Sequence, residues 1–181
     1  RTSTNGGTTW STWSSTKPSV THVSAGPMQV QVKVSRANYN DATASATLTI
    51  TKQAIELTAD SGSWTYDASE HTKPSYTITD GSFATGEGLT SATFAAASAI
   101  TNVGSVANTI TGVTPKAGTQ ENDYAFTYKA GTLTITNATF SVTLTGGSWT
   151  YNGGAHSATL TGTKSSDTIE YRTSTNGGTT W

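Results

Sequence analysis

The sequence contains no cysteine, which excludes disulfides, thiolate metal sites and redox-active cysteine pairs. Charged residues make up only 12% of the chain, and the formal net charge is -1. We therefore expect no basic surface for nucleic acid and no acidic interaction tail. No apolar run approaches the roughly 18 residues that a membrane span needs.

Signals for catalysis are equally scarce. Serine is plentiful, but the G-x-S-x-G turn that exposes a nucleophilic serine is absent. The 11 acidic residues are scattered, with no pair marked as general acid and base. The calcium-loop pattern is also absent, and the acidic stretches at 67–70 and 120–124 are interpreted as solvated loops. We predict that the protein is not an enzyme and needs no cofactor and no metal.

Threonine, serine and glycine dominate the composition instead, and apolar residues alternate with polar ones. Residues 28–34, Met-Gln-Val-Gln-Val-Lys-Val, follow the period of two that is typical of a half-buried strand. Such regular alternation argues against a disordered mucin-like tract and predicts an all-β protein. Further strands are expected at 47–51, 55–59, 75–79, 105–113, 132–136, 140–144 and 169–174.

The sequence repeats itself at two spacings. The segment GSWTYD at 62–67 returns as GSWTYN at 147–152, and TLTIT at 47–51 returns at 132–136, both 85 positions later. The decapeptide RTSTNGGTTW occupies 1–10 and again 172–181, an offset of 171 positions. Its Asn-Gly between two strand-like runs predicts a hairpin turn. We interpret the chain as one 171-residue period, plus ten residues, of a longer repetitive protein.

These spacings predict two related modules of about 85 residues in each period. Residues 53–137 form a complete module, and residues 1–52 are the C-terminal part of a split one. Residues 138–181 are the N-terminal part of the next module, in which 172–181 repeats 1–10. The short strands and frequent turns predict immunoglobulin-like antiparallel β-sandwich modules in tandem, one complete and one split between the two termini.

Several segments resemble a known family. WTYDASEHTKPSYTI at 64–78 and WTYNGGAHSATL at 149–160 are similar to the Tyr-Asp-Gly opening of bacterial surface-protein repeats, the MBG/YDG class of Ig-like modules. The segment from 23 to 51 resembles their closing turn, alternating strand and final T-x-T-I strand. In the opening at 64–78, Ala68 stands where the family favours glycine. The resemblance implies an extracellular, cell-surface stalk or adhesin made of tandem repeats, and it implies no ligand.

Two groups of aromatic residues stand out as candidate functional positions. Residues recurring in both modules are assigned a structural role, because a shared packing function predicts recurrence: Trp64, Tyr66, His71, Trp149, Tyr151 and His156. The two histidines are expected to make hydrogen bonds rather than to bind metal, since neither has a second histidine nearby. Trp10, Trp13 and Trp181 flank the predicted hairpin and are candidates for an exposed surface that could stack on sugar rings. In a regular strand, Trp10 and Trp13 would face opposite sides, and His22 is assigned no role.

Two functions fit these observations. The first is a structural segment of a secreted or cell-surface filament or stalk, whose partners are neighbouring copies joined head to tail. The alternative is an adhesin repeat that binds a host or environmental glycan, or another surface, through exposed aromatic residues. We also expect the C-terminal part of one copy to complete a module with the N-terminal part of the next. The two decapeptide copies would then compete for one place in a sheet, leaving one of them displaced, disordered or overlapping.

Overall fold

The computed structural model describes residues 1–23 and 26–181 and confirms an all-β protein. In the described residues the only helical element is a 3-10 turn, η1 (Glu121–Asp123). The chain divides into two compact units, Arg1–Asn137 and Ala138–Trp181. Two positions of the family-like closing segment, 24 and 25, lie outside the described residues. No helix in the described part of the chain is long and apolar enough to cross a membrane.

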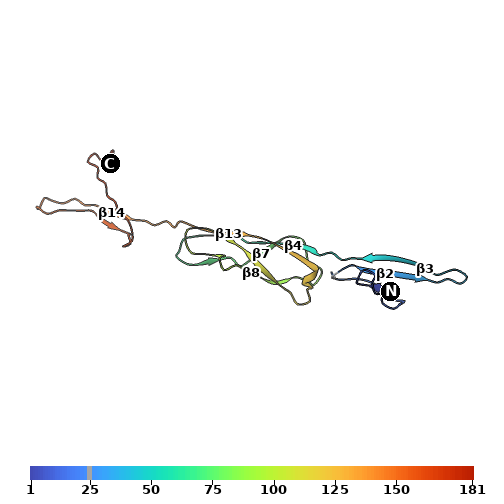
Figure 1. Cartoon of the computed structure of the whole chain (residues 1–181). Coiled ribbons are helices and arrows are strands. Elements are labelled where there is room, and N and C mark those ends of the chain that lie inside the picture. The colour runs from blue at the N-terminus through green and yellow to red at the C-terminus, as the bar shows by residue number, and fades with distance from the viewer. Residues whose placement is uncertain (24–25) are drawn as a thin grey trace. The chain divides into compact units, whose positions relative to one another are not determined.

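The first unit begins with a three-stranded antiparallel sheet in which β2 (Met28–Val34) is central (Figure 1). β2 pairs along its whole length with β3 (Ala42–Leu48). On its other side, β1 (Thr2–Ser3) covers only the first half of β2. The predicted strand at 28–34 is confirmed, whereas the one at 47–51 is wrong beyond Leu48, because the chain leaves the sheet there.

The segment from 53 to 136 holds ten strands, several of which are labelled in Figure 1. They form two three-stranded sheets, β10-β13-β5 and β12-β4-β7, and the pairs β11-β8 and β6-β9. The predicted strand at 105–113 is divided between two sheets, with a break at Thr109. The bounds are β4 (Gln53–Ala59), β5 (Gly62–Thr65), β6 (His71–Thr72), β7 (Tyr76–Asp80), β8 (Leu89–Phe94), β9 (Ala99–Ile100), β10 (Gly104–Asn108), β11 (Ile110–Pro115), β12 (Tyr124–Lys129) and β13 (Gly131–Thr136).

The expectation that all strands are antiparallel is wrong at two places. β12 pairs in parallel with β4, and β13 pairs in parallel with β5. The last two strands of this segment therefore lie beside its first two strands and run in the same direction. This pairing brings the two ends of the segment together and encloses its apolar side chains.

The core of the first unit lies within residues 53–136. One cluster centres on Ile55 and Leu57, both 0% exposed, and includes Ile110 and Tyr124. A second cluster contains Ile100, Leu133 and Ile135, with Trp64 packed against it. The period-two alternation of β4 and β13 places these aliphatic side chains on one face of each strand, as the sequence predicts.

The second unit has only one pair of strands, β14 (Thr143–Thr145) and β15 (Thr159–Thr161). The predicted strands at 140–144 and 169–174 are therefore wrong for most of their length. A strand needs a neighbour for its backbone N–H and C=O groups. Residues 138–142 and 169–174 have no neighbouring strand in the described structure, although both carry the alternating pattern.

Counterparts in the two 85-residue repeats differ sharply in burial. Ile55 and Leu57 are fully buried, whereas Phe140 and Val142, 85 positions later, are 77% and 51% exposed. The register of pairing is nevertheless retained: Met28 lies opposite Leu48 in the first sheet, as Val106 lies opposite the equivalent Leu133. The residues at 138–144 thus have the sequence of a core strand without a core around them.

Candidate functional site

The first tryptophan–histidine motif is a small, self-contained structure. The rings of Trp64 and His71 stack with their centroids 4.8 Å apart and an interplanar angle of 17°. One carboxylate oxygen of Asp67 accepts a hydrogen bond from the Ser69 N–H and lies 3.0 Å from Nε2 of His71. A Cβ at Gly62 would lie 2.3 Å from the indole. Glycine is therefore the residue that lets the indole lie against the backbone.

The second motif has the same geometry in the other unit. Trp149 and His156 stack at 4.8 Å and 8°. Oδ1 of Asn152 accepts from the Gly154 N–H and lies 3.1 Å from Nε2 of His156. A Cβ at Gly147 would again overlap the indole, at 2.8 Å. The motif therefore forms whether or not a core surrounds it, so its conformation depends on local contacts.

Both histidines use Nε2 within their own motif. The Ser69 N–H and then the His71 ring hold the pKa of Asp67 below its usual value, whereas the uncharged Asn152 occupies the equivalent position. In the described part of the chain no group of three or more His, Asp and Glu side chains could hold a metal ion. The neighbouring Tyr66 and Tyr151 are 40% and 93% exposed and pack little.

The two decapeptides fold into the same loop. In the first, the Ser3 hydroxyl accepts from the Gly7 N–H at 2.9 Å, and Asn5 Oδ1 accepts from the Thr9 N–H at 3.0 Å. In the second, Ser174 and Asn176 make the equivalent bonds at the same two distances. Both Gly-Gly pairs adopt positive φ. The predicted hairpin is wrong, because residues 8–13 form no strand beside β1. The loop is thus determined by its own ten residues.

The surroundings of the two loops differ. Thr2 and Ser3 pair with β2, and Ser3 is 3% exposed. The second copy, 172–181, pairs with no strand among the described residues. One copy therefore lies in a sheet, and the other lies outside one among the described residues.

The candidate tryptophans at these loops stack on arginine. The Arg1 guanidinium lies 5.0 Å from the ring centroid of Trp10 and 4.6 Å from that of Trp13. Arg172 lies 5.2 Å from the Trp181 ring. The expectation that Trp10 and Trp13 face opposite sides fails, because residues 10–14 form no regular strand. Trp13 and Trp181 remain 44% and 66% exposed.

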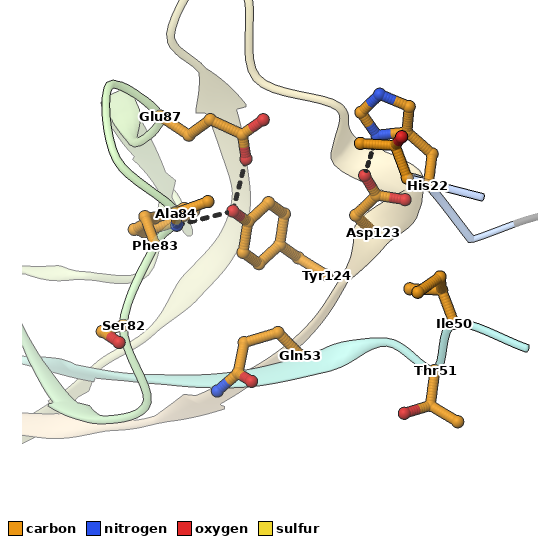
Figure 2. A pocket seen from close by; sticks show the side chains of 11 residues that line it. His22, Ile50, Thr51, Gln53, Ser82, Phe83, Ala84, Glu87, Asp123 and Tyr124 are labelled. Carbon is orange, nitrogen blue, oxygen red and sulfur yellow. Dashed lines mark hydrogen bonds and ion pairs between the residues drawn. The ribbon is translucent and has the colours of Figure 1, made fainter. Parts of the chain in front are cut away.

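A pocket of about 410 Å³ lies in the first unit, where the 21–22 and 50–53 segments approach the core strands (Figure 2). Its buried side is formed by Tyr124, whose hydroxyl donates to the Glu87 carboxylate and accepts from the Ala84 N–H. Burial, and then the hydrogen bond to Glu87, raise the pKa of Tyr124. The tyrosine therefore stays neutral at ordinary pH, and the hydrogen bonds of its hydroxyl hold the loop at 82–87 in place.

His22, to which sequence analysis assigned no role, forms the other side of this pocket. Its Nδ1 lies 2.5 Å from one carboxylate oxygen of Asp123 (Figure 2). The other oxygen accepts from the Val23 N–H at 2.6 Å. Asp123 belongs to the acidic stretch 120–124, and both its oxygens are occupied by these contacts. No sequence signal links the two residues, because they are 101 positions apart.

We expect the contact between the 21–23 segment and Asp123 to be lost in acid. The hydrogen bonds from His22 and then Val23 hold the pKa of Asp123 below its usual value of 3.8. The folded state therefore binds this proton less readily than the unfolded state. The contact is fully present above pH 3.8 and disappears as the pH falls through the lowered pKa.

The Val23 amide proton shift, followed by NMR during acid titration, measures this loss. In Asp123→Asn the amide oxygen can still accept from Val23, but no carboxylate titrates. The acid-induced shift should therefore vanish in that variant. A Val23 shift that changes identically in both proteins would contradict the assignment.

Comparison of the chain with protein-family models, with curated proteins and with solved structures gave no significant match.

Proposed function

We propose that this chain is a structural segment of a secreted or cell-surface filament or stalk, in which Ig-like modules follow one another head to tail. The observation that carries the proposal is the difference in burial between the two repeats. Residues 53–136 enclose a core, whereas Phe140 and Val142, the counterparts of the buried Ile55 and Leu57, lie exposed. A repeat with these properties acquires its second core from a neighbouring repeat.

The chemistry of the pockets and motifs supports a structural role. The recurrent Trp, His and Asp or Asn side chains are engaged with one another. In the pocket around Tyr124, the carboxylate of Glu87 is hydrogen-bonded to Tyr124 and that of Asp123 to His22. No described group in that pocket pairs a nucleophile with a base, so its polar contacts serve to position loops.

One observation favours the adhesin alternative. Trp181 is 66% exposed, and Trp13 is 44% exposed beside a groove lined by β2 and residues 14–18. Exposed indoles stack on sugar rings. A glycan array with the chain, with Trp13→Ala and with Trp181→Ala distinguishes the two functions: tryptophan-dependent binding supports the adhesin, and its absence supports the stalk.

Mechanical unfolding of a chain with two joined periods tests the stalk proposal directly. An 85-residue module releases about 30 nm of chain when it unfolds. The 181-residue chain should give one such event, from residues 53–136. The two-period chain should give one event for each of its two copies of that segment. It should give a further event for the joined halves 138–181 and 11–52. Lack of the further event would show that the halves do not form a module.

A further inference from the structure

The two tryptophan–histidine motifs differ at the residue that contacts the histidine. Asp67 fills this position in the first motif, with Oδ1 3.0 Å from Nε2 of its histidine, and Asn152 fills it in the second, at 3.1 Å. Each Oδ1 also accepts from the N–H two residues further on. The loop therefore adopts the same conformation with a carboxylate or with an amide at this position.

Asn152 is followed by glycine, and this dipeptide allows an asparagine to lose its amide nitrogen. The peptide nitrogen of Gly153 gives up its proton to solvent and attacks Cγ, so that a C–N bond forms. Ammonia leaves as the bond between Cγ and Nδ2 breaks. Water then opens the cyclic imide: cleavage of the new C–N bond gives aspartate, and cleavage of the original peptide bond gives isoaspartate. Glycine favours the attack because it carries no Cβ beside the nitrogen.

Three segments of the chain share the sequence Asn-Gly-Gly, beginning at Asn5, Asn152 and Asn176. In the first decapeptide, Asn5 Oδ1 accepts from the Thr9 N–H and Nδ2 donates to the Thr9 hydroxyl. Thr180 holds Asn176 in the same way. Loss of ammonia from either of these asparagines has to break the hydrogen bond from Nδ2 to threonine. The decapeptide loops therefore protect their asparagines.

The amide of Asn152 is held through its oxygen alone. Oδ1 accepts from the Gly154 N–H at 2.9 Å, and because this oxygen can only accept, Nε2 of His156 carries the proton of their contact. Nδ2 makes no hydrogen bond to the described residues. A bond to the N–H two residues on folds the side chain over the intervening peptide, which belongs to Gly153. A Cβ on Gly154 would accordingly lie 3.2 Å from Oδ1 and 3.9 Å from Cγ.

The two donors to Oδ1 lie where negative charge develops during the reaction. As the Gly153 nitrogen attacks, the amide oxygen becomes an oxyanion, and donors already aimed at it stabilise that charge. The leaving nitrogen has no hydrogen bond to break, and Asn152 is exposed to the water that opens the imide. The equivalent Asp67 side chain is 51% exposed within the segment that encloses a core. The position therefore stays accessible to water when a core surrounds the motif.

We propose that Asn152 is a self-modification site, at which the loop converts its asparagine to aspartate without an enzyme. The first motif shows the geometry of the product, because the Asp67 carboxylate accepts from the N–H two residues on and contacts its histidine. That N–H and then the histidine hold the pKa of Asp67 below its usual value, and Gly154 and His156 supply the equivalent donors. The reaction adds one negative charge to the loop and does not depend on the proposed stalk function.

Mass spectrometry of the full chain during incubation at neutral pH compares the three asparagines directly. Lysine and arginine residues lie between them, so trypsin places them in separate peptides. The mass gain from amide to acid should appear at Asn152 roughly tenfold faster than at Asn5 or Asn176, because only there are oxyanion donors combined with a free leaving group. Fragmentation locates the product and separates aspartate from isoaspartate. Equal rates at the three positions, or a slower rate at Asn152, would overturn the proposal.

Incubation in guanidinium chloride removes the folded geometry and leaves the sequence unchanged. Because the three asparagines share the same two following residues, their rates should converge in the unfolded chain. A preference for Asn152 that persists in denaturant would assign its reactivity to the flanking sequence and overturn the structural argument.

His156→Phe removes the Nε2 donor and keeps a ring that can stack on Trp149. This variant should lose Asn152 several-fold more slowly than the parent chain, because one oxyanion donor is missing. The rate at Asn176, measured in the same sample, should stay unchanged and serves as the internal reference. An unchanged Asn152 rate would contradict the role given to His156.

Two further variants separate the hydrogen bond from the stacking. His71→Phe makes the same change in the first motif and should leave all three asparagine rates unaltered. His156→Gln restores an N–H donor without the stacked ring, so it should recover part of the rate that His156→Phe loses. A glutamine variant as slow as the phenylalanine variant would assign the effect to loop conformation and overturn the donor role.

Discussion

Replacing Ile55 with alanine is expected to lower the free energy of unfolding of the 53–136 segment by about 2–5 kcal/mol. Ile55 is 0% exposed and contacts the cluster of Leu57, Ile110 and Tyr124, so the substitution leaves a cavity that β4 cannot close. Because a module of this size changes its melting temperature steeply with stability, the midpoint should fall by about 10 °C or more. Urea unfolding followed by tryptophan fluorescence and by amide exchange of β4 and β13 measures the loss.

Phe140→Ala is the matched control for this prediction. Phe140 is the counterpart of Ile55 in the repeat and is 77% exposed, so truncating it should change the stability of the free chain by less than about 0.5 kcal/mol. The same substitution in a chain with two joined periods should be costly, since the proposed function buries this position. Equal effects of Ile55→Ala and Phe140→Ala in the free chain would contradict the burial on which that proposal rests.

Gly81→Ala is expected to destabilise the same segment by about 2–5 kcal/mol. Gly81 follows β7 with a φ of 77°, and a Cβ there would lie 2.0 Å from the Ala54 carbonyl oxygen and 3.1 Å from Cδ1 of Ile55. The alanine therefore suffers backbone strain, and it also pushes β4 away from the core. Differential scanning calorimetry of the two proteins measures the combined cost.

Gly86→Ala separates the two contributions. Gly86 has a similar φ of 88°, but nothing lies within 4 Å of its Cβ position. Its substitution should carry only the strain of the left-handed conformation, about 1–2 kcal/mol. If both variants lost the same stability, the close approach of Gly81 to β4 would contribute nothing.

Local structure was the part most accessible to sequence reasoning. The alternation in residues 28–34 predicts β2 with its observed bounds. The decapeptide and the Trp-His motif each form the same conformation twice, in different surroundings. Their contacts join residues a few positions apart, so composition and spacing determine them. The hydrogen bonds made by His71 and His156 follow the same rule.

Pairing between distant strands was not accessible in the same way. The identical alternation at 55–59 and 140–144 gives a core strand in one place and an exposed segment in the other, because only β4 has β12 and β7 beside it. The parallel pairing of β12 with β4, and the contact of His22 with Asp123, join segments far apart in the chain. Such contacts depend on which strand edges pair. The residue pattern of a single strand shows which of its faces is apolar, but it does not specify the partner strand.

The sequence by itself therefore determined the class, the repeat and the turns of this protein. It is an all-β chain whose sequence repeats at spacings of 85 and 171 positions, and its loops are rich in Gly, Asn, Ser and Thr. Only the tertiary structure decided which repeat encloses a core and which strands pair. The physical reason is that the alternation of apolar and polar residues determines which face of a strand is apolar, whereas burial of that face requires a second surface to cover it. Residues 53–136 supply this surface for themselves, whereas Phe140 and Val142, with the same alternation, have no such surface in the described structure.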